Sequence, residues 1–240
     1  MPLKTKRRRL SSATASSTQS RSSTSTLPQQ AHVAFIPLLA VCFIFWVIYR
    51  LIFTFPVAFD ETIGKALFFG LPVWLYVSMT GSRIIPDTFD LIKLRRGLLL
   101  GIAFGGIFGF ASVLLKLWQG DQVVVAAPLF TAPLFWGEFI LAIMTGFWET
   151  LFFFSWIYTV IDQKWFKWPL LQKVVLCAGI FVLFHLPNTV LRLEGSMGLA
   201  QLLLLFLFAM GQALLFHQHR NGYALVLSHA IWGLILLLHF

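Results

Sequence analysis

The sequence is poor in charged residues and has only two cysteines. Asp, Glu, Lys and Arg together make up 11% of the 240 residues, against about 25% in an average soluble domain. This scarcity excludes an ordinary soluble globular domain. Cys42 and Cys177 both lie in apolar stretches, which excludes a disulfide framework and a paired-cysteine metal site. The sequence also has no HExxH and no GxSxG motif, so a zincin helix and a nucleophile elbow are excluded.

What the sequence has instead is a series of long apolar runs, and 58% of its residues are hydrophobic. Each run is near the length of about 20 residues that a helix needs to cross a bilayer. Continuous runs such as LLLLFLFAM (202–210) exclude the alternating strands of a membrane barrel. We therefore predict an all-α, polytopic transmembrane helical bundle of about seven spans. The predicted spans are about 34–55, 63–80, 97–117, 134–161, 170–191, 198–217 and 222–239.

Two stretches have additional features. The third predicted span carries Gly101, Gly105 and Gly109 at every fourth position, a pattern that favours close packing against a neighbouring helix. The stretch 123–136 is apolar but contains Pro128 and Pro133. We interpret it either as a re-entrant segment or as the irregular start of the fourth span.

Basic residues are concentrated in the N-terminal region and in alternate loops. Residues 1–30 combine the basic cluster KTKRRRL (4–10) with a Ser/Thr-rich stretch, so we predict a disordered cytoplasmic tail followed by a transmembrane domain over 31–240. The net charge of +9 does not indicate a nucleic-acid partner, because the positive-inside rule and attraction to anionic lipids explain this distribution. With seven spans, the positive-inside rule predicts that the N-terminus is cytoplasmic and the C-terminus non-cytoplasmic. The predicted protein is an integral membrane protein in contact with the lipid bilayer.

Three ionisable residues lie deep inside separate predicted spans: Glu149, His185 and His229. A charge at the bilayer centre costs at least about 2.5–3.5 kcal/mol, so such residues usually face the protein interior and are often functional. Each also has a structural interpretation, as a neutral group that is hydrogen-bonded within the bundle. Glu138 lies eleven residues before Glu149, on about the same helix face with Thr145 between them. This polar stripe favours a hydrated cavity.

A carboxylate and two imidazoles from three helices can together activate a water molecule. Glu149 would act as general base, and the histidines would assist it, stabilise an oxyanion or hold a metal. The same three residues, Glu149, His185 and His229, are therefore also candidate ligands of a divalent metal such as zinc. Ser228 is a poor nucleophile partner for His229 because adjacent helical residues point to different faces.

The order and spacing of these residues resemble the CAAX-protease and bacteriocin-processing family of intramembrane endopeptidases. The segment FWETLFFFSW (147–156) is similar to the family motif EExxxR, with Glu149 at its first glutamate. Phe181 and His185 match FxxxH, and His229 in SHAIWG matches the start of HxxxN. The resemblance covers about 137–239. It implies that Glu149 and His185 activate a water, that His229 supports the oxyanion, and that a metal is a candidate cofactor.

Three positions depart from the family motifs. Thr150 stands at the second glutamate, Phe154 at the arginine and Gly233 at the final asparagine. At Gly233 an amide donor is lost, and removing one oxyanion donor in a protease costs about 10²–10³ in rate.

The leading hypothesis is an intramembrane endopeptidase that hydrolyses a peptide bond in a membrane-associated peptide or protein, prenylated or otherwise membrane-bound. The first alternative is a weakened or inactive relative that acts as a membrane binding or immunity protein. The second is a small proton-coupled transporter that uses Glu138, Glu149 and the histidines as a proton relay. Internal repeats with paired broken helices would favour the transporter, and the sequence shows none.

Overall fold

The computed structural model describes residues 29–118, 135–192 and 195–238, and these residues contain helices and no strand. The elements are α1 (Gln29–Ile52), α2 (Val57–Phe59), η1 (Asp60–Gly64), η2 (Ala66–Gly70), α3 (Leu71–Thr80), α4 (Ile84–Thr88), η3 (Leu91–Lys93), α5 (Leu94–Trp118), α6 (Phe135–Glu149), η5 (Thr150–Tyr158), α7 (Thr159–Lys164), α8 (Leu170–Arg192), α9 (Gly195–His219) and α10 (Gly222–Leu238). Residues 1–28 of the predicted tail and the proline-containing part of 123–136 lie outside the described residues.

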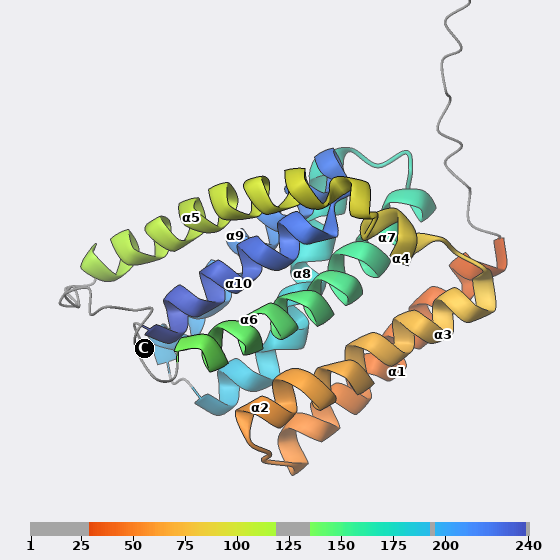
Figure 1. The fold of residues 1–240 in the computed structure, drawn as a ribbon. Helices are drawn as coiled ribbons and strands as arrows, with labels where there is room; N and C mark the ends of the chain where they lie inside the picture. Colours follow the sequence, from red (N-terminus) through yellow and green to blue (C-terminus); the bar gives the residue numbers. More distant parts are fainter. Residues whose placement is uncertain (1–28, 119–134, 193–194, 239–240) are drawn as a thin grey trace, which may run out of the picture.

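The described helices confirm an all-α polytopic bundle (Figure 1). Six of them are long and apolar enough to cross a membrane: Val33–Ile52, Val57–Thr80, Ile84–Leu114, Phe135–Lys164, Leu170–Val190 and Gly198–His219. The stretch Gly222–Leu234 is a shorter apolar helix and corresponds to the seventh predicted span. The protein is therefore an integral, multi-pass membrane protein.

Small residues on α5 let it lie directly against α10, and the two helices run side by side in Figure 1. A Cβ atom added at Gly101 would lie 2.7 Å from Leu227 Cβ, and one at Gly105 would lie 2.9 Å from Ile231 Cβ. Both distances are too short for real Cβ contacts. The glycine pattern therefore predicted a close helix contact correctly, and the structure adds that α10 is the partner.

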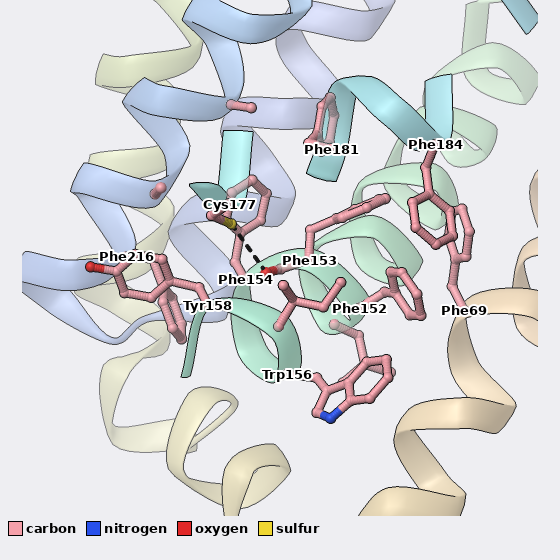
Figure 2. Close-up of a cluster of buried hydrophobic side chains, with 14 of the residues drawn as sticks. Phe69, Phe152, Phe153, Phe154, Trp156, Tyr158, Cys177, Phe181, Phe184 and Phe216 are labelled. Carbon is pink, nitrogen blue, oxygen red and sulfur yellow. Dashed lines mark hydrogen bonds between the residues drawn. The ribbon is translucent and has the colours of Figure 1, made fainter. Parts of the chain in front are cut away.

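The fourth span, formed by α6, η5 and α7, is the centre of the bundle. In its most apolar stretch 61% of the residues are buried, against 22–39% in the other long spans. Phe152, Phe153, Phe154 and Trp156 of η5 are fully buried and form the aromatic core in Figure 2. These rings face the core and not lipid, because this helix is surrounded by other helices.

Several parts of the bundle are π-helical, with wider turns than an α-helix. The segments η1 and η2 flank Lys65 on the second span, and η5 begins directly after Glu149 on the fourth. π-helical turns inside α-helices are frequent at functional sites. The two spans thus change their helical geometry where Lys65 and Glu149 meet.

Candidate active site

Glu149 ends α6 and is almost fully buried, with 2% of its side chain exposed. Its Oε2 atom lies 3.6 Å from Nε2 of His185 on α8 and 3.4 Å from Nε2 of His229 on α10. The structure thus brings together all three residues that the sequence singled out, although 80 positions separate the first from the last. The three side chains converge because the central span lies between α8 and α10.

The ring of His185 is held in a defined orientation. Its Nδ1 lies 2.8 Å from the backbone carbonyl oxygen of Phe181 and donates a hydrogen bond to it. The ring also stacks on that of Phe181, with centroids 4.2 Å apart. Because Nδ1 carries the hydrogen, Nε2 of the neutral ring keeps its lone pair. That lone pair is on the side of Glu149.

His229 is positioned by a close approach between α10 and α6. A Cβ atom at Gly146 would lie 2.8 Å from the carbonyl oxygen of Val226 and 3.3 Å from Cβ of His229, so only glycine fits there without a shift. The ring of Phe208 meets that of His229 edge to face, with centroids 5.0 Å apart. Nδ1 of His229 is buried with no hydrogen-bond partner in the described part of the chain. The proton of this ring is therefore free to lie on Nε2.

The second span contributes two charged residues that the sequence reasoning missed, Lys65 and Glu61. Lys65 Nζ lies 2.5 Å from Glu149 Oε1 and 2.5 Å from Glu61 Oε2. Thr145 on α6 donates its hydroxyl hydrogen to the same Glu61 oxygen at 2.5 Å. A signal was present in the sequence, because Lys65 is an ionisable residue inside the predicted span 63–80.

The two oxygens of Glu149 differ in their surroundings. Oε1 accepts a hydrogen bond from Lys65, whereas Oε2 has no hydrogen-bond partner within the described segments. Its distances of 3.4 and 3.6 Å to the two Nε2 atoms are longer than good hydrogen bonds. A buried water needs two to four polar partners, and these three atoms supply that number. These atoms are thus the polar partners that a water next to this carboxylate would have.

The remaining polar residues of the predicted site lie in different surroundings. Glu138 is half-buried and makes no ion pair with another described residue. Ser228 points away from the site into a buried pair with Gln212, whose Nε2 donates to its hydroxyl oxygen at 2.9 Å. Thr150 is fully buried and its hydroxyl has no partner among the described residues. A Cβ atom at Gly233 would meet nothing within 4 Å, so that position has room for a side chain.

The residues fit a divalent metal poorly. Across 29–118, 135–192 and 195–238, no group of three or more His, Cys, Asp or Glu side chains is arranged to hold one. The Lys65 ammonium already provides a positive charge 2.5 Å from Glu149 Oε1, where it would repel a metal bound to the same carboxylate. The metal predicted from the sequence stays a prediction, and we derive no chemical step through it.

Comparison with known proteins gives one finding. No curated protein and no solved structure matches the chain significantly. One family model matches, that of the Rce1-like type II CAAX prenyl endopeptidases, over residues 130–235. This segment contains Glu149, His185 and His229 but not Lys65. The match confirms the resemblance indicated by the three motifs, and the C-terminal part of the chain is thus similar to the Rce1-like type II CAAX prenyl endopeptidases.

Proposed function

We propose that the protein is an intramembrane endopeptidase of the CAAX type, in which Glu149, His185 and His229 activate water against a peptide bond of a membrane-associated substrate. One observation supports this proposal above all others. The Glu149 Oε2 atom lies within 3.6 Å of two imidazole Nε2 atoms from two other helices, inside the segment that matches a prenyl endopeptidase family. The family's printed description makes a prenylated peptide the first substrate class to test.

The proposed reaction is a general-base hydrolysis. Glu149 Oε2 takes a proton from the water, while the Nε2 lone pair of His185 accepts the water's second hydrogen bond and orients it. The water oxygen bonds to the carbonyl carbon, and His229, with its proton on Nε2, donates to the oxyanion that forms. The carbon–nitrogen bond then breaks, and the proton on Glu149 passes to the leaving amine. The products are a carboxylic acid and an amine, and the enzyme returns to its starting state.

A second candidate function is a weakened or inactive relative that binds peptides in the membrane. It is favoured by Gly233, which offers no side-chain amide one helical turn after His229. By itself that loss corresponds to about 10²–10³ in rate. Such a protein would bind the substrate peptide with little or no cleavage.

The test is a cleavage assay on the purified protein in lipid nanodiscs. The probe is a quenched fluorescent peptide that ends in S-farnesyl-cysteine and three further residues, with the unfarnesylated peptide as control. We expect cleavage that Glu149→Gln and His185→Ala each abolish and His229→Ala strongly lowers. A chelator should leave the rate unchanged, because the proposed base needs no metal. Equal rates for the wild type and Glu149→Gln would refute the proposal, and binding without cleavage would support the second candidate.

The proposed orientation has the N-terminus in the cytoplasm. Three basic residues from different parts of the chain are linked through one another or through a shared carboxylate at one end of the bundle. Lys93, after the second span, donates to the backbone carbonyl of Arg220, which follows the sixth. Arg220 and Lys173 both pair with Asp162 at the end of the fourth span. A shared basic end supports the predicted assignment of these loops to the cytoplasmic side.

A further inference from the structure

Lys65 is an unusual residue for a membrane span. Its side chain is only 7% exposed, and its ammonium group lies 2.5 Å from one oxygen of each of two carboxylates, Glu149 and Glu61. Among the described residues it is the only lysine or arginine that pairs with Glu149. It lies outside the family match, which begins at residue 130. Because burying an ammonium group is costly, we looked for a role of Lys65 in the groups that it contacts.

The contacts form two parallel pairs, each separated by one helical turn. Glu61 and Lys65 lie four residues apart on the second span, and Thr145 and Glu149 lie four apart on α6. Thr145 donates to Glu61, and Lys65 donates to Glu149. Glu61 also pairs with the ammonium group, at 2.5 Å. Lys65 is therefore fixed against the base, and the bond to Oε1 leaves Oε2 to face the imidazoles.

The charges of the cluster give the lysine an electrostatic role. With neutral histidines, the two carboxylates and one ammonium sum to one negative charge. Without Lys65, the buried Glu149 would lie near the partly exposed Glu61 with no cation between the two carboxylates. The more buried of the two, Glu149, which is 2% exposed against 25% for Glu61, would then take up a proton, because burial without a counter-charge disfavours the ionised form. A protonated Glu149 cannot accept a proton from water.

We propose that Lys65 is a positioning residue, which keeps the Glu149 carboxylate ionised and turns its Oε2 atom toward His185 and His229. The catalytic part of this inference rests on the function proposed above. The structural part, an ionised Glu149 that depends on Lys65, does not, and it is tested separately. In this arrangement the second span completes a site whose other members all come from the segment 130–235.

The first experiment measures kcat and KM of Lys65→Met with the farnesylated peptide in nanodiscs. We expect kcat to fall by about 10², the lower end of what a general base contributes, with KM within about two-fold because the proposal gives Lys65 no contact with the substrate. Lys65→Arg, which restores a cation, should recover most of kcat. Lys173→Met is the matched control. Lys173 is a similarly buried lysine, 9% exposed and 2.8 Å from Asp162, but it lies outside the site, so its loss should leave kcat nearly unchanged.

The second experiment does not depend on activity. Infrared spectra of the purified protein at neutral pH report a protonated carboxyl group through its C=O stretching band. We expect Lys65→Met to gain such a band, Lys65→Met with Glu149→Gln to lack it, and Lys65→Met with Glu61→Gln to keep it. Lys173→Met should not gain the C=O stretching band of a protonated Glu149.

The outcomes separate the two proposals. If the wild type cleaves, Glu149→Gln is inactive and Lys65→Met keeps the wild-type kcat, the role of Lys65 is wrong and the proposed function stands. If the wild type does not cleave the peptide, the proposed function fails, and the infrared result alone decides whether Lys65 keeps Glu149 ionised. Absence of the new band in Lys65→Met would overturn that part as well.

Discussion

Gly146 is the position where a single methyl group should disturb the candidate site without touching its chemistry. The Cβ atom of an alanine at 146 would lie 2.8 Å from the backbone carbonyl oxygen of Val226 and 3.3 Å from Cβ of His229. A carbonyl oxygen inside a helix cannot rotate away as a side chain can. We therefore expect Gly146→Ala to push α10 away from α6 and to move His229 relative to Glu149.

The size of the effect follows from these distances. Ordinary contact begins at 3.4 Å, so the helices must separate by about 0.6 Å to relieve the overlap of the new methyl group with the carbonyl oxygen. The distance of 3.4 Å between His229 Nε2 and Glu149 Oε2 would grow by a similar amount. A misplacement of 1 Å can cost about 10² in rate, so a shift of this size predicts a loss of about 10-fold. Overpacking costs about 1–3 kcal/mol of stability, partly offset by about 1 kcal/mol because alanine is the better helix former.

The assay compares Gly146→Ala with Gly179→Ala in the same nanodiscs. A Cβ atom at Gly179 on α8 would meet nothing within 4 Å, so this control makes the same chemical change without a clash. We expect Gly179→Ala to keep the wild-type rate and to be as stable as the wild type or up to about 1 kcal/mol more stable, and Gly146→Ala to lose about 10-fold in kcat at a temperature where both are folded. An unchanged kcat for Gly146→Ala would refute the reasoning that the approach of α6 and α10 positions His229.

Three further predictions concern other parts of the chain. Glu138→Gln should keep most of the activity, because Glu138 is only half-buried and makes no ion pair with a described residue; a loss as deep as that of Glu149→Gln in the same assay would make it catalytic. Gly233→Asn should raise the cleavage rate by about 10-fold or more by adding an amide donor near His229, because a side chain at 233 has open space; a lower rate in a folded variant would contradict this. A reporter fused to the C-terminus should be active on the non-cytoplasmic side, as the positive-inside rule requires, and a cytoplasmic signal would mean that the number of spans is wrong by one.

The sequence by itself determined the fold class and most of the spans. Apolar runs of about 20 residues have few stable forms in a bilayer, because each backbone polar group must be hydrogen-bonded within its own helix or barrel. The predicted fifth and seventh spans, about 170–191 and 222–239, therefore agree closely with Leu170–Arg192 and Gly222–Leu238, whereas the second, about 63–80, begins six residues later than Val57–Thr80. The high cost of a charge in the bilayer also singled out Glu149, His185 and His229, because ionisable residues deep in apolar runs are rare.

The tertiary structure decided what periodicity and composition leave open. No local pattern showed that the fourth span is central, that it becomes π-helical at Thr150, or that α10 is the partner of the glycines on α5. The pairing of Lys65 with Glu149 joins residues 84 positions apart. A lysine inside a span can face lipid near the interface, a cavity or a carboxylate. The residues next to it in the sequence do not distinguish these three environments. Only the packing of the second span against α6 selects the carboxylate, because the energy of a buried charge depends on which groups surround it in space and not on its neighbours along the chain.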